Sequence, residues 1–466
     1  KGKRGLLPAA RIHEIVEAPE EAGMKRAISR YYYSPVKMSL RGAYEMYLMD
    51  ECRTEDGRLQ DERPPFSKFK SVYNKMRSDY RKIISRQGIG EFQKNYRPLL
   101  GQAVDVAPLC GHFEMDATSA DIELVSKYSR QSVGRPYVYL VVDVFSRLIA
   151  GFYVDFNTNT DAVLMCIRSL LQDKVEIARK RGVTIAPDAW PTTGLPCEIT
   201  FDKGKDFMGE RTKELCELFN IEITNLPAYR PDLKGCVERA FGEVQGMYMN
   251  LLHGHGTYEK VNTRLGLNSM HSTPCLDIDE YINILMYCIA DYNSSAIIHG
   301  TRTPEMIAEQ VPPVPTHIWN WMEKKGRTKV IRGNNAELSL MLLPRAVASI
   351  TRRGLVFRGL RYHTDLLDMT KEYVSAGVNG RKKVNIAYDM QCTDYVYLLQ
   401  NGKYIRFNLI DRNTFTGLPF QEVEIIRHEE NQMRKSLTLV KDERAVTRNA
   451  AIKEILRKVK KEKPKK

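Results

Sequence analysis

The sequence predicts a multidomain protein with a helical N-terminal domain, an α/β core, a small all-β barrel and a helical, basic C-terminal tail. The chain has 466 residues, enough for several domains. Apolar strand-like runs alternate with helical patterns in the middle of the chain, and short strands follow one another between residues 346 and 407. We expect domains at residues 1–103, 104–300 and 336–415, with connecting helices at 301–335 and the tail at 416–466.

The N-terminal domain shows two helical patterns. Apolar residues recur at helical spacing after Ser39, and a polar turn at 53–63 closes with Pro64 and Pro65. Ser67 is then expected to cap a second helix over 67–86. This layout is typical of a helix-turn-helix DNA-binding domain, although a solvated basic face on a packing helix is the alternative. The basic residues that we expect to contact DNA are Lys68, Lys70, Lys75, Arg77, Arg81 and Lys82.

The core pattern predicts a five-stranded mixed sheet flanked by helices. Strands are expected at 112–117, 136–144, 148–156, 197–202 and 221–224. Helices are expected at 160–181, at 209–219, from about residue 235 onward and at 277–293. The first three strands follow one another without a helix, which indicates an antiparallel meander.

Three acids stand out within this core. Asp116 lies on the first strand, Asp202 ends the fourth strand, and Glu238 lies at the start of a helix 36 positions after Asp202. Carboxylate oxygens suit Mg²⁺, and two such ions can activate an attacking oxygen and stabilise the leaving oxygen of a phosphodiester. Taken alone, Asp202 or Glu238 would be expected to be a surface residue rather than a ligand, since acids are mostly exposed. Asp143 is the alternative to Asp116 as a metal ligand, and Glu243 is the alternative to Glu238.

Basic residues gather around these acids, and they are expected either to neutralise phosphates or to remain solvated surface. They are Lys203, Lys205, Arg230, Lys234 and Arg239. Asp121 and Asp206 are candidates for supporting the acidic ligands. His253 and His255 have the spacing of a metal-binding pair, but no further ligand lies near them in sequence, so a turn is expected.

Composition narrows the possible partners and compartments. The net charge of +14 and pI of about 9.2 favour a polyanionic partner. The nine cysteines form no Cys-x-x-Cys pair, which is typical of reduced intracellular thiols. There is no run of 18 apolar residues, no signal peptide and no phosphate-binding loop for ATP. Because the chain begins with Lys1 rather than Met, we expect a processed or truncated chain.

The C-terminal third changes character twice. Six short strands, with Asn401-Gly402 as a hairpin turn, predict the barrel. From Pro419 onward the pattern is helical and charged, and residues 441–466 carry 11 Lys or Arg against 4 Asp or Glu. That excess of seven is half of the net charge, so the tail is expected to be flexible when alone and to bind DNA or a partner.

The order of these elements resembles the catalytic core of the retroviral-integrase and DDE-transposase superfamily. The segments that carry the resemblance are MDATSADIELVSKYSRQSVGRPYVYLVVDVFSR (115–147) and AYRPDLKGCVERAFGEVQ (228–245). They are similar to the TnsB family of transposase subunits and, more loosely, to Mu transposase. The similarity covers residues 105–300 and continues more weakly to about 415. Many integrases have Asp-Asn-Gly where this chain has Asp202-Lys203-Gly204, which leaves the carboxylate in place and adds a cation.

The resemblance implies a ribonuclease-H-like core in which Asp116, Asp202 and Glu238 are catalytic and hold two Mg²⁺ ions, with Mn²⁺ as a substitute. It implies that Asp143 is structural. The implied activity is DNA transposition: binding of transposon ends, cleavage at the 3′ ends and joining of the 3′-OH to target DNA. Implied partners are further copies of the chain on paired ends, an AAA+ ATPase of the TnsC kind and an endonuclease of the TnsA kind.

The implied location is the bacterial cytoplasm, in association with the nucleoid and not with a membrane. Two other classes stay open from the residues alone. One is a structure-specific nuclease on the same core, which would cut but not join DNA. The other is a non-catalytic, end-binding architectural protein whose acids are vestigial.

Overall fold

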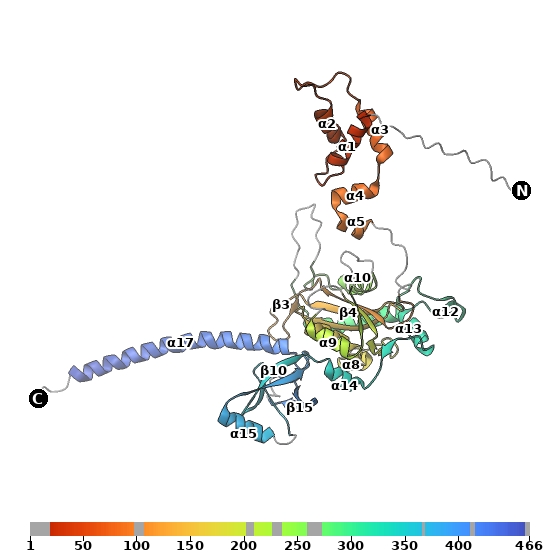
Figure 1. Cartoon of the computed structure of the whole chain (residues 1–466). Helices are drawn as coiled ribbons and strands as arrows, with labels where there is room; N and C mark the ends of the chain where they lie inside the picture. The colour runs from red at the N-terminus through yellow and green to blue at the C-terminus, as the bar shows by residue number, and fades with distance from the viewer. Residues whose placement is uncertain are drawn as a thin grey trace. The chain divides into compact units, whose positions relative to one another are not determined.

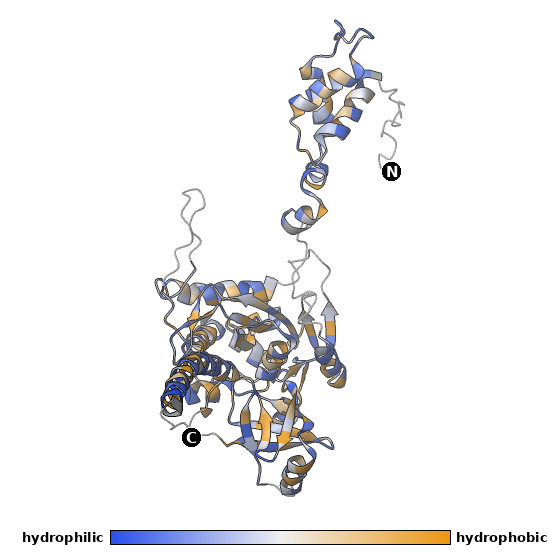
Figure 2. Cartoon of the chain, turned by 90° about the vertical axis from the view of Figure 1, so that its left-hand side faces the viewer, coloured by the Kyte–Doolittle hydropathy of each residue, from blue (hydrophilic) through white to orange (hydrophobic). Residues whose placement is uncertain are grey.

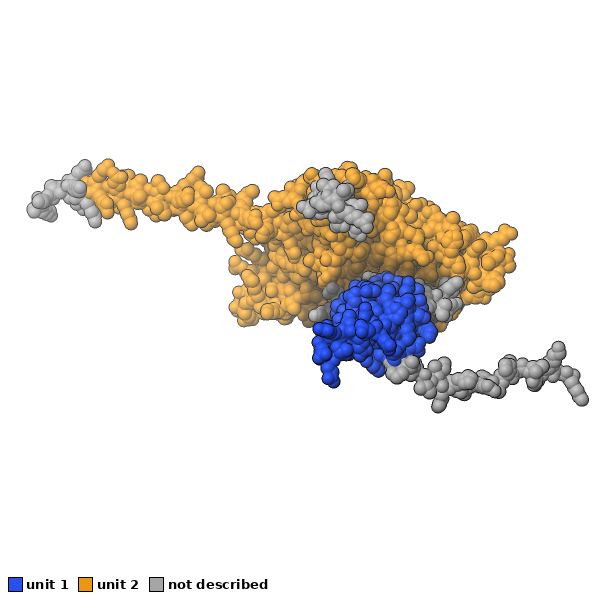
Figure 3. All heavy atoms as spheres, turned by 90° about the horizontal axis from the view of Figure 1, so that it is seen from above, with its two compact units in different colours: residues 1–101, 227–232 blue, residues 102–226, 233–466 orange. Residues whose placement is uncertain are grey.

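The computed structural model describes residues 19–96, 107–201, 209–225, 235–258, 273–365, 369–410 and 415–461. The chain divides into two compact units (Figure 3), the first holding the described residues up to 96 and the second those from 107 onward. Buried apolar residues form one cluster in the first unit and two in the second. Each unit therefore has its own hydrophobic core.

The regular elements in the described part of the first unit are helices (Figure 1), and a non-helical segment at 52–65 connects two of them. The unit contains α1 (Pro19–Ala27), the π-helical turn η1 (Ile28–Tyr32), α2 (Leu40–Glu51), α3 (Phe66–Met76), α4 (Asp79–Gln87) and α5 (Ile89–Asn95). Ser39 caps α2 by accepting a hydrogen bond from the amide of Gly42, so the expected helix start is confirmed. The hydrophobic core of the first unit contains many aromatic residues, and Tyr44, Tyr47 and Phe69 are in mutual contact within it.

The prediction of a single helix over 67–86 is wrong in two respects. It begins at Phe66, where the amide of Lys68 donates to the carbonyl of Pro65, so Ser67 is not the cap. It also breaks after Met76, because Ser78 adopts an extended backbone and its side chain caps a new helix at Arg81. The apolar periodicity continues across the break, which is why the pattern alone predicts one helix.

The second unit is built on a five-stranded mixed sheet of order β5-β4-β1-β7-β8, as expected. The strands are β1 (His112–Ser119), β4 (Tyr137–Asp143), β5 (Ile149–Asp155), β7 (Glu198–Phe201) and β8 (Glu222–Asn225). β1 pairs antiparallel with β4 and parallel with β7, so it is the middle strand. The meander of the first three expected strands is confirmed as β1, β4 and β5.

Helices cover both faces of this sheet. α7 (Thr160–Ser169) and α9 (Glu210–Leu218) contribute to the apolar cluster on one face, with Phe113 and Met115 of β1. α10 (Gly235–Met249) and α11 (Ile278–Ser295) cover the other face, against Leu140 and Val142 of β4. The helix expected over 160–181 is instead two helices, because the side chain of Asp173 caps α8 (Lys174–Lys180) at the amide of Glu176.

The predicted barrel is present and closed, in the order β10-β11-β12-β15-β14-β13. Its strands are β10 (Arg345–Thr351), β11 (Gly354–Phe357), β12 (Leu360–His363), β13 (Lys382–Tyr388), β14 (Tyr395–Gln400) and β15 (Lys403–Leu409), with α15 (Met369–Asn379) inserted after β12. Three helices precede it: α12 (Pro304–Ala308), α13 (Pro315–Lys324) and α14 (Asn335–Met341). Two short ladders complete the unit: β2 (Leu124–Val125) with β3 (Ser132–Gly134), and β6 (Leu195–Pro196) with β9 (Val330–Ile331).

The sheet and the barrel share one hydrophobic cluster, which runs from β1 and α7 through α13 into the barrel strands. Figure 2 shows the apolar residues gathered on these strands. A nearly buried ion pair reinforces the contact: Arg168 Nη1 of α7 lies 2.8 Å from Asp389 Oδ2, just after β13. Arg168 Nε also donates to Ser339 of α14. The barrel is therefore packed against the sheet's own core.

The C-terminal helix α17 (Phe420–Lys461) begins against the rest of the second unit (Figure 1). Near its start, Ser126 donates to the Glu422 carboxylate, and Gln421 donates to Asp155. From Met433 onward its described side chains are mostly exposed. Within the described ranges no helix combines the length and the apolar character needed to cross a lipid bilayer.

Candidate active site

Asp116 lies on the middle strand of the sheet, four residues after the start of β1. In the antiparallel ladder it is opposite Leu140, and Glu114 is opposite Val142. Directly opposed residues in an antiparallel pair point to the same face. Asp116 and Glu114 therefore lie on the face that α10 and α11 cover. Asp116 is partly exposed, so its carboxylate is accessible to a ligand.

The second predicted acid, Asp202, lies outside the described residues. The strand that leads to it is described as far as Phe201. In the parallel ladder between β1 and β7, Glu114 pairs with Thr200. Asp116 follows Glu114 by two residues, and Asp202 follows Thr200 by two residues.

Glu238 lies in the first turn of α10, on its exposed side. The preceding residues Cys236 and Val237 are buried in the apolar cluster on the same face of the sheet. α10 packs against both β1 and β4. α10 therefore lies on the sheet face that carries Asp116, with Glu238 in its first turn.

A buried acid that the sequence analysis overlooked joins α10 to β1. Glu114 Oε2 accepts hydrogen bonds from the backbone amides of Cys236, at 3.1 Å, and Val237, at 3.0 Å. The available signal was an acid in the middle of an apolar strand, together with a helix that starts near Gly235 with no Ser, Thr, Asp or Asn directly before it. Such a helix needs an acceptor from elsewhere in the fold.

The expectation that Asp143 is structural is confirmed. This residue is fully buried, and burial raises the pKa of its carboxyl group. Its Oδ1 accepts from the amide of Gly111, and its Oδ2 accepts from the amide and hydroxyl of Ser146, each at 2.7 Å. The two bonds from Ser146 hold the turn between β4 and β5, and the bond from Gly111 ties that turn to the residue before β1, so both oxygens of Asp143 are engaged within the fold.

Two arginines lie near the acids. Arg147 is in the turn after β4 with a φ of 63°, and burial lowers the pKa of its guanidinium while the charge of Glu114 partly offsets that effect. Arg239 is exposed on α10, and its positive charge lies close enough to Arg147 to lower the pKa of the Arg147 guanidinium. The other predicted basic residues of the site lie outside the described residues: Lys203, Lys205, Arg230 and Lys234.

The other residues that the sequence offers as ligands or supporting groups differ in their surroundings. Glu243 is exposed on α10. Asp121 pairs with Arg135 at 2.7 Å and accepts from Gln245, while Asp206 lies outside the described residues. His253 and His255 lie in a turn, where the ring of His255 contacts the carbonyl of His253 at 3.0 Å, so the expected turn is confirmed.

The acids offer oxygen donors, which fit Mg²⁺ or Mn²⁺ better than softer metals. Among the residues that the structure describes, no group of three or more His, Cys, Asp or Glu residues is placed to hold a metal ion. Asp202 is not among those residues.

The basic residues of the first unit differ in their partners. Lys68 pairs with Glu20 and Lys75 with Glu21, both acids of α1. Arg77 pairs with Asp79, and Arg81 donates to Ser29 and lies over the ring of Tyr33. In the described part of the chain, the side chains of two predicted contact residues form no polar contact within the protein. These residues are Lys70 on α3 and Lys82 on α4.

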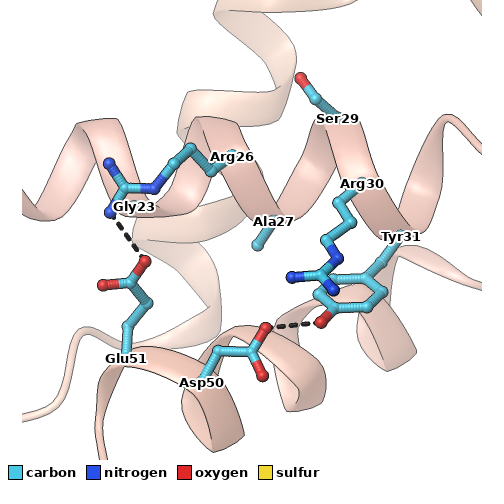
Figure 4. A pocket seen from close by; sticks show the side chains of 8 residues that line it. All are labelled: Gly23, Arg26, Ala27, Ser29, Arg30, Tyr31, Asp50 and Glu51. Atoms are coloured by element: carbon cyan, nitrogen blue, oxygen red, sulfur yellow. Dashed lines mark hydrogen bonds and ion pairs between the residues drawn. The ribbon is translucent and has the colours of Figure 1, made fainter.

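A surface pocket of about 640 Å³ lies between α1, η1 and α2 of the first unit (Figure 4). Arg26 forms an ion pair with Glu51 at 2.7 Å across it. The hydroxyl of Tyr31 donates to Asp50, and this bond raises the pKa of Tyr31. Figure 4 shows the guanidinium of Arg30 beside the Tyr31 ring. Because its two arginines are matched by two acids, the pocket has no excess positive charge to attract a phosphate.

The fold and the site together define an α/β domain with acids on its middle strand and on a covering helix, joined to a helical unit and a β-barrel. Three family models match these parts: "TnsB transposase helix-turn-helix domain" at residues 20–92, "TnsB C-terminal domain" at 114–254, and "Mu transposase, C-terminal" at 339–406. The matches follow the same order along the chain as the three structural parts.

Among individual proteins, the chain is similar in sequence to TnsB. The chain is 30% identical to the transposition protein TnsB of transposon Tn7 from Escherichia coli, over 80% of this chain and 54% of that protein. It is 23% identical to the transposase for transposon Tn552 from Staphylococcus aureus, over 68% of this chain and 59% of that protein. The chain thus spans a little over half the length of these relatives. The resemblance expected from the sequence is confirmed.

Among solved structures, the catalytic core domain of BIV integrase matches 46% of this chain and 97% of its own, with 16% identity and a TM-score of 0.26. Because this TM-score is low, the description of the fold rests on the chain's own strand order and register.

Proposed function

We propose that the chain is a DNA transposase that binds transposon ends, cleaves at their 3′ ends and joins the 3′-OH to target DNA. The observation that supports the proposal is that Asp116 lies on β1 and that the helix carrying Glu238 in its first turn is hydrogen-bonded to the same strand through Glu114. The similarity to TnsB over most of the chain supports it.

In this proposal the three acids hold two Mg²⁺ ions, for which Mn²⁺ can substitute. Asp116, Asp202 and Glu238 would supply the carboxylate oxygens that bind the ions. When bound, the ions activate the attacking oxygen and stabilise the leaving oxygen. Arg239 and the basic residues near Asp202 hold the DNA phosphates, which gives affinity without sequence information.

The proposed domain division assigns end binding to residues 1–103, chemistry to 104–300, connection to 301–335, the barrel to 336–415 and the basic tail to 416–466. Within the first unit, Lys70 and Lys82 are the foremost phosphate contacts, because their side chains have no polar partner in the described structure. The net charge of +14 suits a partner as anionic as DNA.

The proposed partners follow from the same similarity. Two transposon ends require at least two copies of the chain. An AAA+ ATPase of the TnsC kind and an endonuclease of the TnsA kind are the proposed protein partners. The proposed location is the bacterial cytoplasm, in association with the nucleoid.

The test is a strand-transfer assay with pre-cut end DNA, a plasmid target and Mg²⁺, comparing the native chain with Asp202→Asn and Asp116→Asn. Partner proteins are added in a parallel set. Joined product that both substitutions abolish, with end binding intact in EDTA, supports the transposase. Cleavage without joining supports a nuclease instead. End binding without either reaction, in both sets, supports an architectural protein.

A further inference from the structure

The start of α10 is fixed to the middle strand through one side chain. Glu114 is 3% exposed, and its Oε2 accepts from the amides of both Cys236 and Val237. Amides in the first turn of a helix have no partner within the helix, and they lie at its positive end. A carboxylate at this place satisfies two of them and complements the helix dipole.

The two described acids of the site flank this contact. Asp116 follows Glu114 by two residues and lies on the same face of β1. Glu238 follows Val237 directly, in the first turn of α10. The Glu114 side chain therefore links the strand that carries Asp116 to the helix turn that carries Glu238. A shift of α10 along β1 would change the distance between Asp116 and Glu238.

We propose that Glu114 is a positioning residue, which sets the separation of Asp116 and Glu238 and thereby the affinity of the site for divalent metal ions. The inference rests on the proposed function, because that function makes these two acids metal ligands. Residues that orient metal ligands without touching the metal typically change metal affinity 10- to 100-fold when they are replaced.

The chain offers a matched control in Asp277. It is also buried, at 6% exposure, and it caps the start of α11 by accepting from the amide of Glu280 at 2.9 Å. α11 carries none of the three predicted ligands. Glu114→Gln and Asp277→Asn make the same chemical change at two helix starts, since each replaces one carboxylate oxygen with an amide nitrogen.

The experiment measures Mn²⁺ binding to the full chain on end DNA, by the electron paramagnetic resonance signal of free Mn²⁺, for the native chain and both variants. The thermal midpoint is recorded for each. We expect Glu114→Gln to weaken Mn²⁺ binding by about tenfold or more and to raise the Mg²⁺ concentration for half-maximal joining by a similar factor. We expect Asp277→Asn to lower the thermal midpoint and leave Mn²⁺ binding unchanged.

A Glu114→Gln variant that loses thermal stability but binds Mn²⁺ as the native chain does would overturn the proposal, because Glu114 would then only anchor the helix. If this variant does not fold, Glu114→Asp carries the same test, since it keeps the charge and shortens the side chain by one methylene. A native chain that binds Mn²⁺ but joins no DNA would overturn the proposed function, and the Mn²⁺ titration would still decide the role of Glu114.

Discussion

Three carboxylates of one sheet show how much environment decides the role of a residue. Asp143 is fully buried, with one oxygen bonded to the turn after β4 and the other to the amide of Gly111, whereas Asp116 is partly exposed on the neighbouring strand. Glu114 is buried like Asp143, but its acceptor capacity serves a helix rather than a turn. From sequence, the resemblance separates Asp143 from Asp116. The sequence does not reveal the hydrogen-bond partners of Glu114, because they are backbone amides more than 120 residues away.

Lys174 gives the second unit a stability that depends on pH. This residue of α8 is 2% exposed, and its Nζ has no hydrogen-bond partner in the described structure. Burial lowers its pKa to about 7 from an ordinary value of 10.5. Between these pH values the unfolded chain holds a proton that the folded chain lacks, so the free energy of unfolding rises with pH from about 7 to about 10.

We expect Lys174→Met to abolish this rise and to stabilise the chain at pH 7 by an amount on the order of 4 kcal/mol. The measurement is urea unfolding at pH 7, 8 and 9. Lys180→Met on the exposed side of the same helix is the control, and its stability should follow that of the native chain. Parallel pH profiles for the native chain and Lys174→Met would contradict the expectation.

At the scale of elements, the positions of the strands were predicted better than the first and last residues of the helices. The apolar run of β4 and the short runs of the six barrel strands are local signals, so their positions follow from the sequence. The breaks before α4 and α8 were missed because the side chains of Ser78 and Asp173 act as caps inside a continuing apolar period. The two-residue strands β2 and β6 are too short to leave a pattern.

For the helices of the first unit, we expect Lys70→Gln and Lys82→Gln each to weaken end-DNA binding and to reduce its salt dependence by about one unit of slope. The reason is that neither side chain has a polar partner within the described protein, so each is available to a phosphate. Affinity is measured by fluorescence anisotropy between 50 and 200 mM salt, concentrations chosen to span roughly the physiological range.

Lys324→Gln on α13 removes the same charge from an exposed position in the second unit, which makes it the control. Equal losses of affinity and slope in all three variants would show that only net charge matters. In that case α3 and α4 would not be the DNA-contacting helices.

At the scale of the whole second unit, sheet and barrel are joined by a shared apolar cluster and by the pair Arg168–Asp389, whose side chains are 13% and 12% exposed. Sequence reasoning placed both domains but gave no sign of this contact, because its two charged partners are 221 residues apart. Long-range pairing of this kind depends on the assembled fold and leaves no local pattern.

We expect Arg168→Met to lower the free energy of unfolding by about 3–5 kcal/mol, since it leaves Asp389 charged and nearly buried. The double variant Arg168→Met with Asp389→Leu should recover most of that loss, because no unpaired charge remains. Urea unfolding followed by tryptophan fluorescence and by circular dichroism measures both. A single variant as stable as the native chain would show that the pair contributes nothing.

The shared cluster has a thermodynamic consequence for anything that binds to the barrel. If the barrel cannot open without exposing the core of the sheet, a ligand of the folded barrel stabilises the sheet as well. At a free concentration one hundred times its dissociation constant, such a ligand adds about 2.7 kcal/mol to the free energy of unfolding. Binding of a ligand to the barrel would thus raise the free energy of local opening around Asp116, without any change in the position of the acids.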